Sequence, residues 1–182
     1  MKLEDKKLVR DFLGGDDSAF EKLTKVHLKP VFNFVYRLVK DTSAAEDLTQ
    51  VTFIKAWKNL KRYDTSKNFK TWLFTIAKNT AYDYFKKKKT IPFAYFEDAE
   101  GHNFLENMES DTFEPEATLD FEISLKKLES ALEKIPARCS EVLLLCYKDD
   151  FTLQEIAEIL GESYNTIKSR HARAIVKLKK CV

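Results

Sequence analysis

Glycine, proline and cysteine are all scarce in this sequence. Its 182 residues include four Gly, four Pro and three Cys. So few Gly and Pro argue against a β-rich fold, which needs many tight turns, and neither a strand pattern nor a Gly-rich phosphate loop occurs. We therefore predict an all-α fold. The three cysteines, Cys139, Cys146 and Cys181, lack metal-ligand spacing and are typical of thiols in a reducing cytoplasm.

Long apolar runs and catalytic patterns are lacking as well. The opening segment, MKLEDKKLVRDF, is too polar for a signal peptide, and no stretch suits a membrane span. We therefore expect a cytoplasmic protein without direct membrane insertion. Paired carboxylates with metal spacing and a nucleophile–base pair are also missing from the pattern. The sequence thus predicts a protein that is not an enzyme and that uses no cofactor and no metal.

Charge is strongly segregated along the chain, although the net charge is only +2. Residues 55–89 contain eleven Lys or Arg and two acidic residues with aromatic rings interleaved, whereas residues 91–122 contain ten acidic residues and no Lys or Arg. Every charged residue after Glu162 is basic. Basic side chains neutralise phosphates, and exposed rings can stack on unpaired bases. The pattern predicts two small helical domains joined by an acidic flexible linker.

Helical periodicity in the first half predicts four helices. A short helix should end at Gly14 and Gly15, and a longer helix should follow to residue 40, bent or split at Pro30. The lone His27 within it is expected to be a structural or surface residue and not a ligand. A third helix over residues 41–60 should start with a capping box of Ser43 and Glu46. Its core side is predicted to be Leu48, Val51, Phe53, Ile54 and Trp57. A polar loop over residues 63–68 leads into the fourth helix, residues 69–89.

The last part of the chain has the pattern of a helix-turn-helix. Thr152 and Glu155 can form a capping box, Gly161 should end the first helix, and Ser163 should cap the second. Ile167, Ala174 and Leu178 form the inner stripe of that second helix, and hydrogen-bond donors lie between them. The pattern favours DNA binding over an ordinary helical hairpin with a solvated basic face.

Two longer motifs resemble a known family. The run IPARCSEVLLLCYKDDFTLQEIAEILGESYNTIKSRHARAIVKLKK resembles region 4 of bacterial extracytoplasmic-function (ECF) sigma factors, and SAAEDLTQVTFIKAWKNLKRYDTSKNFKTWLFTIAKNTAYDYFKKKK resembles their region 2. The ordered pair AEDLTQ..F.KAW and F..WL..IA.N...D is more specific than the helix-turn-helix. The resemblance implies a region 2 domain over residues 1–91, a linker over 92–121 and a region 4 helix-turn-helix domain over 122–182.

The resemblance also implies partners. Region 2 in this family binds the clamp helices of the β′ subunit of core RNA polymerase and opens the minus-ten element, and region 4 reads the minus-thirty-five element and touches the β-flap. The protein would then be a sigma factor for promoter DNA, with an anti-sigma factor as regulator. Motif positions imply polymerase contacts for Asp47, Leu48, Gln50 and Phe53. They imply minus-ten contacts for Lys67, Asn68, Phe69, Lys70, Trp72, Asn79, Asp83, Lys86, Lys87 and Lys88. They imply minus-thirty-five contacts for Tyr164, Asn165, Thr166, Lys168, Ser169, Arg170 and Arg173.

One departure and three alternatives accompany this interpretation. His171 stands where the family usually has leucine, so its ring either weakens the inner packing or reaches a phosphate. A stand-alone helix-turn-helix regulator would leave the AEDLTQ helix and the acidic linker without a purpose. A nuclease or recombinase would need a carboxylate or tyrosine centre, but Tyr63, Tyr82 and Tyr84 lack an accompanying Arg–His set. A purely structural module does not explain two basic zones separated by an acidic one.

Overall fold

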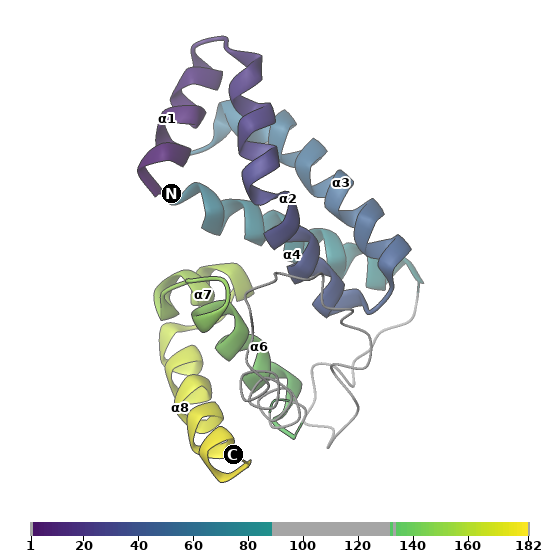
Figure 1. Ribbon diagram of the computed structural model, residues 1–182, viewed down its shortest axis with the longest axis vertical. Coiled ribbons are helices and arrows are strands. Elements are labelled where there is room, and N and C mark those ends of the chain that lie inside the picture. Colours follow the sequence, from purple (N-terminus) through teal and green to yellow (C-terminus); the bar gives the residue numbers. More distant parts are fainter. Residues whose placement is uncertain (1, 89–131, 133, 182) are drawn as a thin grey trace, which may run out of the picture. The chain divides into compact units, whose positions relative to one another are not determined.

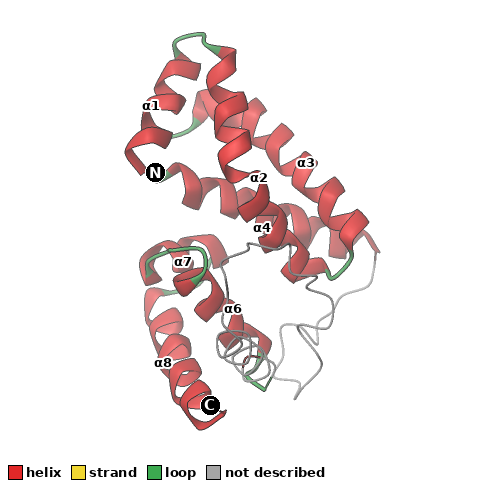
Figure 2. Ribbon diagram, viewed as in Figure 1, coloured by secondary structure: helices red, strands yellow, loops and turns green. Residues whose placement is uncertain are grey.

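The computed structural model describes residues 2–88, 132 and 134–181, and its described secondary structure is entirely helical (Figures 1 and 2). This agrees with the predicted all-α class. The acidic linker predicted over residues 92–121 lies outside the described residues. None of the described helices is long and apolar enough to cross a membrane.

The first two helices meet at a glycine turn, as predicted. Helix α1 spans Lys2–Leu13 and α2 spans Asp17–Val39, and Gly15 between them has a φ of 103°. The Asp16 carboxylate caps α2 by accepting a hydrogen bond of 3.0 Å from the Ser18 amide. Pro30 does not split α2, which runs through it. The carbonyl that loses its partner to Pro30 belongs to Val26, an exposed residue, so water can satisfy that group.

The cap of the third helix differs from the prediction. Helix α3 spans Thr42–Asn59, and a 3₁₀ turn, η1, follows at Leu60–Arg62. Its N-cap is Asp41, whose side chain accepts a 2.8 Å hydrogen bond from the Ala44 amide. The predicted capping residue Ser43 lies inside the helix. Asp41 has the extended backbone that an N-cap requires, and its carboxylate also favours the positive end of the helix dipole.

Helix α4 completes the N-terminal group of helices. It spans Phe69–Lys88 and packs against α1, α2 and α3. The core between α2 and α4 contains Phe34 and Phe74, whose ring centroids lie 5.1 Å apart, and Leu23 and Leu73 are fully buried. This core holds α4 and the loop before it against the other helices.

The last part of the chain forms three helices, α6 (Ala137–Tyr147), α7 (Leu153–Leu160) and α8 (Tyr164–Cys181). Helices α6 and α8 pack together around an apolar cluster that includes Cys139, Leu143 and Ala174. Gly161 after α7 has a φ of 71°, and its amide donates to the Ala157 carbonyl at 2.9 Å. The prediction of a glycine-terminated helix is confirmed.

Ser163 caps α8 as predicted. Its hydroxyl oxygen accepts a 3.1 Å hydrogen bond from the Thr166 amide and lies 2.8 Å from the Thr166 hydroxyl. The two described helices of the motif are therefore separated by a short turn with a glycine at one end and a serine cap at the other.

Candidate nucleic-acid interface

The loop over residues 64–68 is closed by its own side chains. Asp64 Oδ1 accepts hydrogen bonds from the Ser66 amide at 3.0 Å and the Ser66 hydroxyl at 2.7 Å. These bonds, the one from the hydroxyl above all, lower the pKa of the exposed Asp64 carboxyl. The Lys67 amide donates to the Asp64 carbonyl at 3.0 Å. The loop is therefore a defined turn that leaves the Lys67 side chain exposed.

Tyr63 anchors this loop to the core. Its ring is buried, and its hydroxyl donates to the Lys67 carbonyl at 2.7 Å. Burial raises the pKa of Tyr63 to about 12, with smaller contributions from the nearby carboxylates of Asp64 and Asp5. The neutral phenol is therefore favoured, and it is the form that can donate this hydrogen bond.

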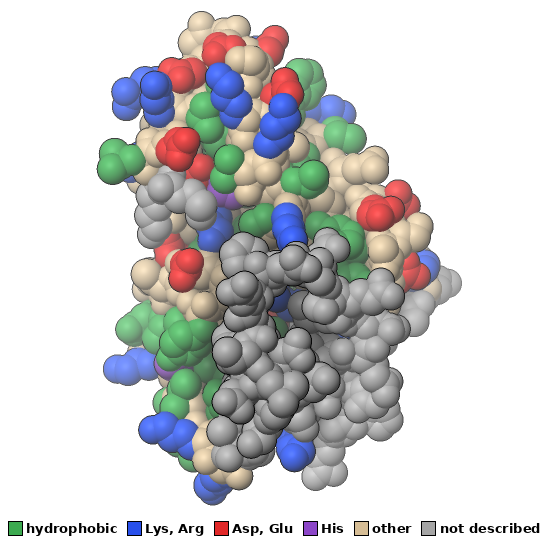
Figure 3. All heavy atoms as spheres, viewed as in Figure 1, with side chains coloured by type: hydrophobic (Ala, Val, Ile, Leu, Met, Phe, Trp, Pro, Cys, Tyr) green, Lys and Arg blue, Asp and Glu red, His purple; other side chains and the backbone are tan. Residues whose placement is uncertain are grey.

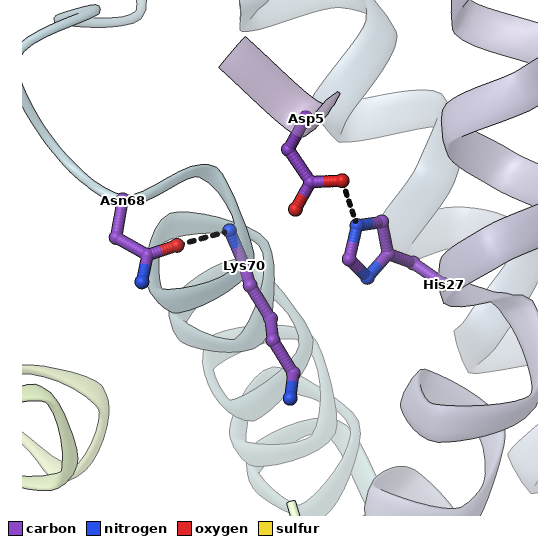
Figure 4. Close-up of polar contacts among 4 residues, drawn as sticks. All are labelled: Asp5, His27, Asn68 and Lys70. Atoms are coloured by element: carbon purple, nitrogen blue, oxygen red, sulfur yellow. Dashed lines mark hydrogen bonds and ion pairs between the residues drawn. The ribbon is translucent and has the colours of Figure 1, made fainter. Parts of the chain in front are cut away.

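Asn68 joins the loop to α4. Its Oδ1 accepts a 3.0 Å hydrogen bond from the Lys70 amide (Figure 4), and its carbonyl accepts a 3.1 Å bond from the Trp72 amide. These are the contacts of an N-cap residue. The predicted contact residue Asn68 thus also sets where α4 begins.

Three rings form a cluster beside the loop. The Tyr63 ring centroid lies 4.9 Å from Trp72 and 6.0 Å from Phe69, and Phe69 lies 5.8 Å from Trp72. Phe69 is buried, whereas Trp72 is partly exposed. Trp72 therefore presents an aromatic surface next to the loop, while Phe69 supports it from inside.

The outer face of α4 brings together several predicted residues. Asn79, Asp83 and Lys86 are exposed and follow Trp72 along one side of the helix at helical spacing. Lys87 and Lys88 are exposed as well, and Lys88 Nζ lies 4.8 Å from the centre of the Tyr84 ring. Asp83 is paired with Lys55 at 3.6 Å. The helix ends in an exposed, strongly basic turn.

Lys70 is placed differently. Only 9% of it is exposed, and its Nζ lies 5.9 Å from the centre of the buried Phe74 ring. It therefore lies on the opposite side of α4 from Asn79 and Lys86 (Figure 4 shows it leaving the start of the helix). The structure does not bring Lys70 together with the outer face.

Helix α3 has apolar residues on its buried side and on its exposed side. The prediction of which of them form the core was partly wrong. Leu48 and Phe53 are buried, but Val51, Ile54 and Trp57, predicted as core, are 38%, 52% and 51% exposed. Asp47 and Gln50 are exposed on the same side. The apolar residues lie around most of the helix, and periodicity could not show which side faces the core. We name the exposed set Asp47, Gln50, Val51, Ile54 and Trp57 the α3 outer face.

The outer side of α8 carries most of the predicted duplex contacts. Asn165, Lys168, Ser169 and Arg173 are exposed, as are Tyr164 and Thr166 at the start of the helix. Over α8, the charged side chains visible in Figure 3 are all Lys or Arg. Arg170 is an exception, because only 7% of it is exposed. It shares the buried side of α8 with Ile167 and Ala174, so the structure separates it from the other predicted contacts.

His171 has a protein partner. Its Nε2 lies 3.2 Å from the Tyr147 hydroxyl, and the two rings are stacked with centroids 5.8 Å apart. Tyr147 is the last residue of α6. The histidine therefore joins α8 to the end of α6 at the position where an apolar side chain was expected to pack.

Among the described residues, no group of three or more His, Cys, Asp or Glu side chains could hold a metal ion. The assembled surfaces are instead a basic, aromatic face on α4 and its loop, a basic face on α8, and the α3 outer face. Such surfaces suit binding to nucleic acid and to another protein.

Comparisons with known proteins identify the family of this chain. The family model Sigma-70 region 2 matches residues 23–91, and Sigma-70, region 4 matches residues 125–178. The ECF RNA polymerase sigma factor SigW of Bacillus subtilis is 31% identical, with 99% of this chain and 97% of SigW covered. The RNA polymerase sigma factor SigV of the same organism is 29% identical, with 82% of each chain covered.

Two solved structures share the fold. CnrH in complex with the cytosolic domain of CnrY is 23% identical, covers 97% of this chain and 96% of its own, and has a TM-score of 0.64. The sigma factor RpoE from Bartonella quintana, in complex with the anti-sigma factor NepR, is 25% identical, covers 89% and 95%, and has a TM-score of 0.61.

These matches define the class of protein as one with both region 2 and region 4 of the sigma-70 type. Within that class, the chain belongs to the ECF sigma factors.

Proposed function

We propose that this sigma factor directs core RNA polymerase to its promoters through three separate surfaces, and that it starts DNA opening by holding an unpaired minus-ten base beside Trp72. The observation that carries this proposal is the partly exposed Trp72 ring between the closed loop 64–68 and the exposed outer face of α4. A ring in that place can stack on a base while neighbouring lysines neutralise phosphates.

At the minus-ten element, we assign direct contacts to Lys67, Trp72, Asn79 and Lys86–Lys88. The lysines and Asn79 are exposed, Trp72 is partly exposed, and Trp72, Asn79 and Lys86 share one side of α4, which supports this role. Phe69 and Lys70 are buried, so their proposed role is to support the loop and α4 from inside. Asn68 shapes the loop through its cap, and Asp83 is already paired with Lys55.

The proposed docking surface for the β′ clamp helices is the α3 outer face. Val51, Ile54 and Trp57 expose apolar area next to the polar Asp47 and Gln50, and an exposed apolar patch with polar neighbours is typical of a protein-binding site. Leu48 and Phe53, which motif position implied as contacts, are buried and hold α3 in place.

At the minus-thirty-five element, we propose that α8 enters the major groove. The first turn of α8 has no acidic residue, so its amide groups can approach a phosphate. Lys168 and Arg173 supply positive charge, and Asn165 and Ser169 can read base edges. Arg170 orients the helix from its buried side, and the β-flap would be contacted elsewhere on this domain.

The remaining parts of the proposal concern organisation and regulation. The domains are proposed over residues 1–91 and 122–182, with the linker over 92–121 between them, in a cytoplasmic protein that leaves all catalysis to the polymerase. An anti-sigma factor is proposed as a regulator because the similar RpoE was solved with one, NepR.

Run-off transcription with purified core polymerase tests the proposal. Genomic promoter fragments should yield new start sites only when the protein is added, and permanganate should detect unpaired thymines upstream of them. Trp72→Ala should reduce the permanganate signal, whereas the double variant Lys168→Ala and Arg173→Ala should reduce promoter binding before opening. Binding to DNA without core polymerase, and no new transcripts across a broad fragment library, would instead indicate a stand-alone regulator.

A further inference from the structure

A buried polar pair joins α1 to α2. The His27 side chain is fully buried and Asp5 is only 3% exposed. His27 Nε2 lies 3.1 Å from Asp5 Oδ1, and Figure 4 shows the two side chains pointing toward each other from their separate helices. Polar groups in such a place are costly unless they are paired, so each of the two needs the other.

The geometry makes His27 dependent on Asp5. Carboxylate oxygens accept hydrogen bonds, so Nε2 can donate its hydrogen to Asp5 Oδ1. The other ring nitrogen, Nδ1, has no hydrogen-bond partner among the described residues. The orientation of the imidazole is therefore set by this hydrogen bond and by the side chains packed around it.

One of those side chains supports the surface proposed to read the minus-ten element, which consists of loop 64–68, Trp72 and the outer face of α4 and is named here the minus-ten surface. The His27 ring centroid lies 5.5 Å from that of Phe69, the first residue of α4. Phe69 in turn contacts Tyr63, whose hydroxyl closes the loop, and Trp72. The carboxylate of Asp5 is also close enough to contribute to the raised pKa of Tyr63. A continuous set of contacts thus runs from α1 through the core to the loop.

We propose that Asp5 and His27 are positioning residues for the minus-ten surface: their hydrogen bond fixes the imidazole against Phe69, and Phe69 holds Trp72 and loop 64–68 in their reading geometry. Helix α1, which lies outside the matched region 2 segment of residues 23–91, thereby takes part in promoter opening. The structural part of this inference stands on the contacts alone, and its consequence for DNA rests on the proposed function.

The alternative is that the Asp5–His27 pair only attaches α1 to α2. The test therefore needs a control variant that weakens the packing of α1 but leaves Asp5 and His27 unchanged. Val9 serves as this control because it lies on α1 and is 2% exposed. Asp5→Asn keeps an acceptor oxygen for Nε2, Asp5→Ala removes it, and Asp5→Leu removes it while filling the space. The chain has two tryptophans, and all variants carry Trp57→Phe so that the emission comes from Trp72.

The first measurements need no DNA. Hydrogen exchange at the amides of Ser66, Lys67 and Lys70 and the emission of Trp72 report on the loop directly. Asp5→Ala and Asp5→Leu should speed exchange at these amides by about tenfold and shift Trp72 emission to longer wavelength. The exchange rates of these amides in Asp5→Asn should stay within about twofold of the parent. The same is expected for Val9→Ala, even where it loses as much thermal stability as the Asp5 variants. The same exchange rates in Asp5→Leu as in Val9→Ala would overturn the proposal.

The second measurement is binding of a fluorescent single-stranded oligonucleotide, which carries the non-template minus-ten sequence of a promoter mapped by run-off transcription. Asp5→Leu should weaken binding about tenfold and Asp5→Asn less than about twofold. If Asp5→Leu speeds exchange at the loop amides but leaves the affinity for the oligonucleotide unchanged, the proposed role of the pair in DNA binding is overturned. If the parent protein itself does not bind the oligonucleotide, the proposed function fails, while the exchange data still decide whether the pair positions the loop.

Discussion

The exposed tryptophan on α3 offers the sharpest test of how this factor docks on core polymerase. Trp57 is 51% exposed although it lies in a helix that packs on two others. An aromatic side chain buries roughly 150–250 Å² when fully covered, so covering the exposed half of Trp57 removes about 100 Å² from water. At about 25 cal/mol per Å², this burial is worth up to about 2.5 kcal/mol.

Trp57→Ala should therefore weaken binding to core polymerase by about 2 kcal/mol, which is roughly a thirtyfold rise in Kd. The assay is titration of N-terminally labelled protein with purified core enzyme, followed by fluorescence anisotropy. Ile54→Ala should act in the same direction but less strongly, since isoleucine offers less area to cover.

Leu28→Ala is the matched control for this prediction. Leu28 is 49% exposed and lies on α2, so it is not part of the α3 outer face. Its replacement should leave the Kd for core polymerase within about twofold, because an exposed side chain outside the contact contributes little. The reasoning is refuted if Trp57→Ala binds core polymerase like the parent, or if Leu28→Ala loses as much affinity.

Three further predictions follow from described contacts. Asp41→Ala should lower the free energy of unfolding by about 1 kcal/mol in a urea titration, whereas Ser43→Ala should change it by less than about 0.5 kcal/mol, because Asp41 is the cap of α3. Lys168→Ala and Arg173→Ala should each reduce the slope of log K for duplex binding against log salt concentration by about one. Arg170→Ala should mainly lower the melting temperature, because Arg170 is buried. Tyr63 has a pKa of about 12 when folded, against an ordinary value of 10.0, so its contribution to stability is complete below pH 10 and is lost as pH rises toward about 12. Alkaline unfolding of Tyr63→Phe should show a shallower decline over that range; an identical decline would count against this assignment.

Local patterns in the sequence predicted the helices and their ends well. Gly161 and Ser163 do what their residue types favour, a left-handed end and an N-cap, because both effects depend on neighbours within four residues. The glycine turn after α1 follows from the same kind of signal.

Errors arose where two local signals competed. Asp41 and Ser43 are both good caps, and only the extended backbone of Asp41 decides between them. On α3, apolar residues on both sides satisfy helical spacing, so the sequence could not distinguish the buried Phe53 from the exposed Ile54. Which side packs is decided by the neighbouring helices.

Other features depend on residues far apart in the chain and left no local signal. Asp5 and His27 are 22 positions apart, and each alone resembles an ordinary surface residue of an amphipathic helix. The burial of Arg170 depends on how α8 packs, although in sequence it resembles Lys168 and Arg173. Motif resemblance indicated which segments to consider, and packing decides which side chains within them reach the surface.

In the proposed minus-ten role, the closed loop before α4 has a consequence for how strongly affinity differs among bases. Its backbone is held by the Tyr63 hydroxyl, the Asp64–Ser66 bonds and the Asn68 cap before any strand arrives. The conformational entropy of ordering these residues is therefore lost during folding and not during binding. A preorganised loop cannot rearrange around a poorly fitting base. The contacts that such a base fails to make are therefore lost in full from the binding free energy. Discrimination at this position should be steep, and variants that loosen the loop should bind all bases more equally.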